Sequence, residues 1–313
     1  MSSPLAVVET SLRVQALDGY SLGATLYIWA SLDQPPTVAL FSCGGAIPAA
    51  RYAHFARFLA ANGVPVLIYD YRGIGTSRPP QLRALRARAE DWSELDSGGA
   101  IAYLRSRYPR AELIGIAHSI GGLLVGGAPN VSEIERFLFI CAHTGYFKDY
   151  MPRYRWPMAV VWHIVMPALT RMFGYFPARF LGLGENIPAG VALQWAARRS
   201  PDFRPEASAT DTTRANSMIA RYRTVAGEVL VLGFTDDAFA TAAGADRLIA
   251  TFPRLRCHAH FFAPHQVGMS SVGHFGFFRR SAEAQLWPLV LPFVRTGKWP
   301  NFSGSDITGA SQE

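Results

Sequence analysis

Residues 111–127, with the sequence AELIGIAHSIGGLLVGG, decide the fold of this chain. The first seven are mostly apolar and predict a short buried strand, whereas residues 120–127 predict a short glycine-rich helix. Ser119 therefore lies on a sharp turn between a strand and a helix, which requires a strained backbone at the serine. The residues two positions before and after it approach each other closely and must be small. Ala117 and Gly121 meet this requirement.

Strands and helices alternate on both sides of this turn. An initial hairpin is predicted, with strands at 7–16 and 21–30 joined by the Asp18-Gly19-Tyr20 turn. Further strands are predicted at 37–43, 64–69, 134–141, 228–233 and 256–263, and helices at 52–61, 92–108, 241–250 and 282–295. The alternation predicts an α/β fold, with a mostly parallel central sheet flanked by helices on both faces.

One long segment interrupts the alternation. More than 80 residues without a strand pattern separate the strand that ends near residue 141 from the strand that begins at residue 228. The segment is rich in proline, glycine and bulky aromatic residues, and a structureless loop of this length is unusual in a compact domain. We therefore expect residues 146–207 to form a helical cap (lid). The α/β core would then comprise residues 1–145 and 208–313.

The composition excludes several classes of protein. Half of the 313 residues are hydrophobic and 17% are charged, which permits a large buried core and excludes global disorder. The net charge is +7, but the basic residues are mostly scattered arginines without interleaved aromatic residues, so we predict no nucleic-acid partner. The basic charge and the apolar stretch at 156–166 suggest weak contact with a membrane surface.

Other residue patterns concern cofactors and location. Cys43, Cys141 and Cys257 are odd in number and show no CxxC spacing, so neither a disulfide framework nor a zinc site is expected. The glycine-rich runs lack the spacing and placement of nucleotide-binding loops, and we predict no metal and no cofactor. The N-terminal residues do not resemble a signal peptide, and the most apolar stretch, 156–170, is too short to span a bilayer. A cytoplasmic, soluble protein is expected.

We predict that Ser119 is a nucleophile; the alternative is a serine that only caps the N-terminus of the following helix. A nucleophilic serine needs a base, and His274 is the preferred candidate. It lies in the segment SSVGHFG, residues 270–276, between the last predicted strand and the closing helix. A loop at the carboxyl edge of the sheet can bring its side chain over the nucleophile. His265 is a second candidate, and His118 is expected to point away from Ser119. Structural positions are assigned to the remaining histidines, which are His54, His143, His163, His258 and His260.

The base needs an acid that orients it, and the oxyanion needs donors. Asp236 and Asp237 follow the strand at 228–233; we favour Asp237 as the acid, because the residues after it resemble a helix entry that the other aspartate would cap. The amides of Ile120 and Gly121 point above Ser119. A further donor is expected from the CGGA segment at 43–46, with the amide of Ala46 preferred and that of Gly45 next.

These motifs resemble those of the α/β-hydrolase superfamily over nearly the whole chain. The resemblance rests on the order Ser119, Asp237, His274 and on the segments AHSIGG (117–122), CGGA (43–46), DYRGIGTS (70–77) and GHFGFF (273–278). Within the superfamily, the chain resembles poorly characterised bacterial serine hydrolases that carry DYRGxG, a serine elbow and GHFGFF. The elbow departs from the usual GxSxG by one methyl group, at Ala117. The resemblance implies structural roles for Asp70 and Arg72.

The chemistry predicted by these residues is two-step acyl transfer through an acyl-enzyme. The aromatic cap favours a small-molecule ester with an apolar acyl group as the substrate, that is, a carboxylic ester hydrolase. The same triad also serves thioesters, amides and lactones. Three alternatives stay open: an acyltransferase with the same triad, a non-catalytic ligand-binding homologue, and a membrane-associated enzyme of the lipase type. The acyl length and the oligomeric state are not predicted.

Overall fold

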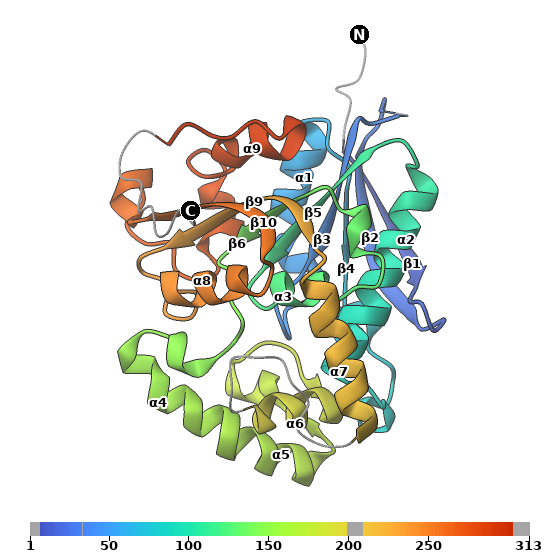
Figure 1. Ribbon diagram of the computed structural model, residues 1–313, viewed down its shortest axis with the longest axis vertical. Helices are drawn as coiled ribbons and strands as arrows, with labels where there is room; N and C mark the ends of the chain where they lie inside the picture. The colour runs from blue at the N-terminus through green and yellow to red at the C-terminus, as the bar shows by residue number, and fades with distance from the viewer. Residues whose placement is uncertain (1–6, 33, 199–208, 303–313) are drawn as a thin grey trace.

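The computed structural model describes residues 7–32, 34–198 and 209–302 of the chain (Figure 1). Its main feature is an eight-stranded sheet with the order β1-β2-β4-β3-β5-β6-β9-β10. The strands are β1 (Val7–Gln15), β2 (Ser21–Trp29), β3 (Thr37–Ser42), β4 (Val66–Tyr69), β5 (Glu112–His118), β6 (Arg136–Ile140), β9 (Ala226–Phe234) and β10 (Arg254–Phe262). β2 pairs antiparallel with β1 and β4, and every pairing from β4 to β10 is parallel. The predicted fold class is therefore correct.

Helices cover both faces of this sheet (Figure 1). The helices between the core strands are α1 (Ala53–Ala61), α2 (Ser97–Arg107), α3 (Gly121–Gly126) and α8 (Ala242–Ala250), and α9 (Trp287–Thr296) closes the fold. α1 packs beside α9, where the rings of Phe55 and Trp287 lie 5.5 Å apart. β3, β4 and β5 are buried along almost their whole length, as strands covered on both faces must be.

Three expectations about local structure differ from what is observed. The closing helix begins at Trp287 rather than near residue 282, because Pro288 occupies its first turn, where a missing N–H costs nothing. The helix expected at 92–108 consists of a π-helical segment, Asp91–Asp96, followed by α2. The segment between β6 and β9 contains a small antiparallel pair, β7 (Tyr175–Phe176) and β8 (Ile187–Pro188). Each strand of this pair has only two residues, too few for a recognisable alternation.

The long segment between β6 and β9 is mainly helical, as expected. It contains α4 (Pro152–Val160), the π-helical η7 (Val161–Val165), α5 (Met166–Phe173) and α6 (Ala189–Ala197), which we call the inserted helices. In Figure 1, α4 and α5 form the lower edge of the molecule, and α6 lies between them and the core. α7 (Ala209–Tyr222) follows these helices along the chain. It contacts the core through Arg214, which forms ion pairs with Asp91 and Glu94 of the π-helical segment before α2. Residues 199–207 of the predicted cap lie outside the described residues.

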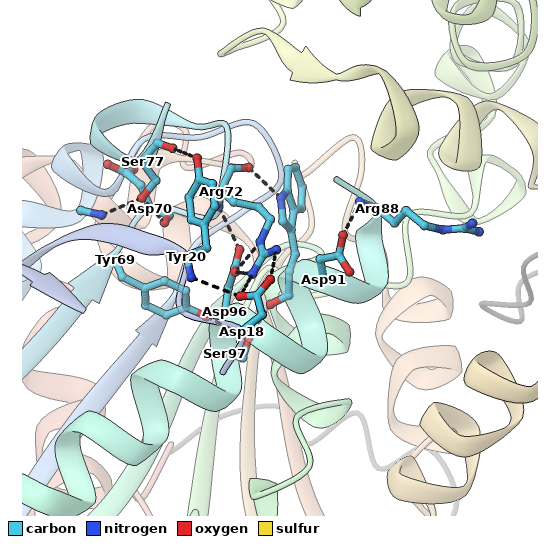
Figure 2. A network of polar contacts seen from close by, with 12 residues as sticks. Asp18, Tyr20, Tyr69, Asp70, Arg72, Ser77, Arg88, Asp91, Asp96 and Ser97 are labelled. Atoms are coloured by element: carbon cyan, nitrogen blue, oxygen red, sulfur yellow. Dashed lines mark hydrogen bonds and ion pairs between the residues drawn. The ribbon is translucent and has the colours of Figure 1, made fainter. Parts of the chain in front are cut away.

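A buried polar network stabilises the DYRGIGTS turn after β4 (Figure 2). The Asp70 carboxylate accepts hydrogen bonds from the amides of Ala49 (2.7 Å) and Thr76 (2.8 Å). Arg72 lies between Asp96 and Asp18, with contacts of 2.7 and 2.8 Å, and the hydrogen bonds from Arg72 hold the pKa of Asp18 below its usual value although burial opposes them. These contacts join β4, the helical segment before α2 and the first hairpin. Asp70 and Arg72 thus have the structural positions that the resemblance implied.

No helix among the described residues is both long and apolar enough to cross a membrane. Cys43 and Cys141 are buried and Cys257 is partly buried, and all three are free thiols. The two buried cysteines pack as small apolar side chains in the core, as expected from the sequence.

Candidate active site

Ser119 occupies the strained turn that the sequence predicts between β5 and α3. Its φ is +57°, in the left-handed region that a residue with a side chain rarely adopts. The turn is tight, because a Cβ atom on Gly121 would lie only 2.4 Å from the carbonyl oxygen of Ser42. Ala117 is completely buried below the turn. The Ser119 side chain is thereby directed to the carboxyl edge of the sheet, where the loops after the neighbouring strands meet.

His274 and Asp237 complete a hydrogen-bonded row with Ser119. The Nε2 atom of His274 lies 3.0 Å from Ser119 Oγ, and its Nδ1 atom lies 2.8 Å from Asp237 Oδ2. Asp237 is buried, and its other oxygen accepts hydrogen bonds from the amides of Phe239 (2.8 Å) and Ala240 (3.0 Å). Burial by itself would raise the pKa of Asp237, but His274 and the two amides outweigh burial and hold this pKa well below its usual range. The carboxylate is therefore ionised and can orient His274.

Asp236, the alternative acid, supports the loop of His274 instead. Its carboxylate accepts hydrogen bonds from the amides of Val272 (2.8 Å) and Gly273 (3.0 Å), immediately before His274. The expectation that the second aspartate caps the following helix is wrong. α8 begins only at Ala242, and its N-cap is Thr241, whose side chain accepts from the Gly244 amide. Asp236 is too far from that helix end along the chain to serve as its cap.

A second histidine, His143, also reaches the Ser119 hydroxyl, and sequence reasoning missed it. Its Nε2 atom lies 3.1 Å from Ser119 Oγ. Its Nδ1 atom accepts a hydrogen bond from the Gly145 amide at 2.8 Å, so the proton of the neutral ring must be on Nε2. Burial lowers the pKa of His143 to about 3, which keeps the ring neutral. His143 therefore donates a hydrogen bond to Ser119 Oγ, while His274 is left to accept the hydroxyl proton.

One feature of the sequence could have identified His143 as a site residue: it follows the strand that lies next to the strand of Ser119. The residue lies just beyond β6, which pairs with β5 so that His118 is opposite Ile140. Side chains that follow the carboxyl ends of neighbouring parallel strands meet at one edge of the sheet. The same reasoning selected the two aspartates after β9. The turn that directs His143 toward Ser119 includes Cys141, whose φ is +48°.

His118 links two loops of the site. Its Nε2 atom lies 2.9 Å from the carbonyl oxygen of His274 and must carry the proton, so its Nδ1 atom accepts from the Tyr52 hydroxyl, also at 2.9 Å. That hydroxyl in turn accepts from the Gly44 amide at 2.9 Å. Burial lowers the pKa of His118 well below its usual value. As expected, this ring is engaged away from Ser119 Oγ; it connects the loop after β3 to the loop of His274.

The loop after β3 lies against the nucleophile turn. A Cβ atom on Gly44 would be 3.3 Å from Ser119 Cβ, and one on Gly45 would be 3.0 Å from Ile120 Cγ2. Ala46 has a φ of +59°, which gives the loop a sharp change of direction. The Gly44 amide is engaged by Tyr52. The loop residues Gly44 and Gly45 thus lie against Ser119 and Ile120, whereas the donors predicted on Gly45, Ala46 and Ile120 stay a prediction.

A pocket with aromatic walls lies next to this loop. Its lining residues are Gly145, Tyr146, Phe147, Trp162, His163, Trp195 and Arg198. The Trp195 indole, from α6, connects the pocket to the site: a Cβ atom on Gly45 would lie 3.3 Å from this ring, and one on Gly145 would lie 3.0 Å from it. The segment before α6 also contacts the loop directly, since the Glu185 amide donates to the Ala46 carbonyl at 2.7 Å.

One group of side chains in the site has the composition of a metal site. Potential ligand atoms of Cys141, Asp237 and His274 lie within 4.8 Å of one another. Burial, followed by the charge of Asp237, raises the pKa of the Cys141 thiol well above its usual value, so the thiol keeps its proton. Thiolates, not thiols, are metal ligands, and Asp237 and His274 already bind each other. Asp237 and His274 therefore fit a hydrogen-bonded row with Ser119 better than a metal site with Cys141.

Comparisons with known proteins agree with this architecture. Residues 19–138 match the model of the Hydrolase_4 family, described as serine aminopeptidase, S33. Similar solved structures include DcsB in complex with its substrate analogue, with 13% identity, 93% of this chain and 99% of that chain covered, and a TM-score of 0.62. The esterase domain of a Rhodothermus marinus protein has 17% identity, coverage of 92% and 98%, and a TM-score of 0.56.

A puromycin-hydrolyzing peptidase from Mycobacterium tuberculosis is also similar, with 14% identity and a TM-score of 0.55; 95% of this chain aligns with 40% of that chain. A search of curated protein sequences found no match. At these identities, the structural likeness establishes the fold. The predicted resemblance to the α/β-hydrolase superfamily is confirmed at that level.

Proposed function

We propose that this chain, which has the α/β-hydrolase fold, is a serine hydrolase that cleaves carboxylic esters with an apolar acyl group. The observation that carries the proposal is the row Asp237–His274–Ser119, with contacts of 2.8 and 3.0 Å, on a serine of positive φ. This arrangement gives the serine a base and gives the base an oriented, ionised acid. All three cysteines are free, which fits the cytoplasmic location that we propose.

In the proposed acylation step, Ser119 Oγ attacks the ester carbonyl carbon while His274 Nε2 takes the hydroxyl proton. The carbonyl oxygen becomes an oxyanion, which accepts hydrogen bonds from the Ile120 amide and from Ala46 or Gly45. The tetrahedral intermediate then collapses, and His274 returns the proton to the departing alcohol. In deacylation, His274 takes a proton from water, the resulting hydroxide attacks the acyl carbon, and the proton returns to Oγ as the carboxylic acid leaves.

His143 has a distinct part in this proposal. Its neutral Nε2–H donates to Oγ and cannot accept the serine proton, so it does not compete with His274 as the base. Oγ becomes more negative when it loses its proton, and again when the acyl-enzyme bond breaks. A donor 3.1 Å away stabilises both states more than it stabilises the resting hydroxyl. We propose that His143 lowers the barrier of both steps.

The aromatic wall of the pocket favours an apolar acyl group, and because the enclosed cavity is only about 10 Å³, we propose that these side chains move apart to admit that group. Aromatic rings of Tyr146, Phe147, Trp162 and Trp195 form most of its wall. An aminopeptidase must also hold the free ammonium group of its substrate, and none of the residues that line this pocket is acidic. This observation favours an ester with an apolar acyl group over an aminoacyl substrate. We propose that the inserted helices act as a lid that excludes water from this group.

The test is hydrolysis of p-nitrophenyl esters from acetyl to palmitoyl, by the wild-type protein and by Ser119→Ala. We expect turnover that disappears in the variant, and a fluorophosphonate probe that labels the wild type alone. Trp195→Ala, which enlarges the pocket, is expected to move the preference toward longer acyl chains. Aminoacyl p-nitroanilides and a competing alcohol acceptor test the peptidase and acyltransferase alternatives. The proposal is wrong if the wild type neither turns over any ester nor reacts with the probe.

A further inference from the structure

The outer side of α4, η7 and α5 carries a row of exposed apolar side chains. Trp156, Val160, Ile164 and Met172 are 74%, 48%, 63% and 66% exposed. They follow a four-residue spacing, and the one intervening position, Ala168, is also exposed and apolar. Among the described residues, nine large apolar side chains are exposed in this way, and seven of them lie between positions 156 and 181. Such a concentration of exposed apolar side chains in one segment of the chain is typical of an interaction surface.

The π-helical segment helps to keep this row on one side. In an α-helix with 3.6 residues per turn, side chains four residues apart drift steadily around the axis. A π-helix closes its hydrogen bonds over five residues instead of four, so four residues make less than one turn and the drift there runs in the opposite direction, which offsets the drift in α4 and α5. η7 (Val161–Val165) lies in the middle of the row. The inward-facing side chains of the same segment, Trp162 and His163, line the pocket.

The charges around this row have one sign. Residues 150–184 contain the four arginines Arg153, Arg155, Arg171 and Arg179 and no aspartate or glutamate. All four are exposed, and Arg179 pairs with Glu185 just beyond this stretch. An exposed helical face with tryptophan, aliphatic side chains and arginine, and without acidic residues, has the composition of helices that lie in a membrane interface.

We propose that this face, which we call the basic apolar face, binds the surface of an anionic lipid bilayer. The aromatic and aliphatic row would enter the headgroup region, and the arginines would bind lipid phosphates. The face is long enough to lie on a bilayer but is not a spanning segment. A second copy of the chain fits less well, because a symmetric contact would bring arginines against arginines without an acidic partner on the face. The docking surface is separate from the proposed esterase activity and does not depend on it.

The test is flotation of the whole protein with vesicles of phosphatidylcholine alone and of phosphatidylcholine mixed with phosphatidylglycerol. The wild type is expected to bind the mixed vesicles selectively, with weaker binding at high salt. A Trp156→Ser, Ile164→Ser double variant should lose about tenfold or more in affinity, because apolar burial in the interface is removed. An Arg153→Gln, Arg171→Gln double variant should lose about 25-fold, since each basic residue near the surface contributes about fivefold.

The controls remove an exposed apolar side chain and an exposed arginine outside the basic apolar face. Val8→Ser replaces an exposed apolar residue of β1, and Arg254→Gln replaces an exposed arginine of β10; neither should change vesicle binding. Turnover of soluble p-nitrophenyl acetate, measured on every variant, reports on the site separately, so loss of binding with intact turnover identifies the face. The inference is overturned if the wild type binds vesicles with and without phosphatidylglycerol equally, or if the variants of the face bind the mixed vesicles as well as the wild type does. A dimer in light scattering that Trp156→Ser dissociates, without vesicle binding, would instead assign the face to a second copy.

Discussion

The hydrogen bond from His143 to the nucleophile allows a quantitative prediction. Replacing His143 with phenylalanine keeps a planar ring in the buried site but removes the N–H that lies 3.1 Å from Ser119 Oγ. A hydrogen bond between neutral groups contributes about 0.5–1.5 kcal/mol, and one to a charged group about 1.5–3 kcal/mol. The bond should therefore be about 1–1.5 kcal/mol stronger in the transition states, where Oγ carries negative charge. The expected decrease in kcat is roughly 5- to 13-fold.

The assay is stopped-flow release of p-nitrophenol, which separates the burst of acylation from the steady-state rate of deacylation. Both phases should slow in His143→Phe, whereas the fraction of protein that reacts with a fluorophosphonate at completion should not change. His143→Gln is the matched variant, because its side-chain amide is also a donor. We expect it to recover part of the lost rate, which a purely structural effect of the substitution would not produce.

The pH dependence tests the assignment of the proton on His143. Burial lowers the pKa of this ring to about 3, so the ring stays neutral through the acidic and neutral range. His143→Phe should then lower the whole profile of kcat against pH without moving its acid limb. A displaced acid limb would refute the neutral donor assignment. A kcat within twofold of the wild type, with normal folding, would refute the claim that His143 stabilises the transition states.

Three further predictions concern the acid, the buried ion pairs and stability against pH. Asp237→Asn should reduce kcat by about 10⁴-fold in ester assays, as loss of the orienting acid does in other triads, whereas Asp236→Asn should have a much smaller effect because it only loosens the loop before His274. Arg72→Met should lower the free energy of unfolding in urea by about 3–5 kcal/mol, because it leaves the buried carboxylate of Asp96 unpaired; an unchanged midpoint would contradict this reasoning. The folded-state pKa of His143 lies below the ordinary value of 6.5, so the unfolded chain binds the proton first and stability falls as the pH drops below about 6.5 toward about 3. Between about pH 5 and pH 6, His143→Gln should remove about 1.2 kcal/mol per pH unit from that slope, and equal slopes in urea titrations would show that the ring is not buried and neutral.

Local patterns in the sequence were sufficient for the framework of this protein. Buried runs alternating with amphipathic segments predicted a parallel sheet covered by helices, because a strand covered on both faces is a continuous apolar run that can be recognised along the chain. The elbow was also predictable, because the close approach around Ser119 demands small residues at fixed offsets along the chain. His274 was found for a similar reason: it follows the last strand, and the carboxyl ends of parallel strands share one edge.

Only the tertiary structure decided how the side chains at that edge meet. Asp236 and Asp237 are adjacent and chemically identical, and the turn after β9 determines that one faces His274 while the other holds the preceding amides. His143 became part of the site through a turn with positive φ that no sequence pattern specified. The outer side of the inserted helices carries large apolar side chains as well as arginines, so periodicity alone could not separate the pocket wall from the exposed row at Trp156. Packing separates them, because burial depends on which elements lie opposite each side chain in space.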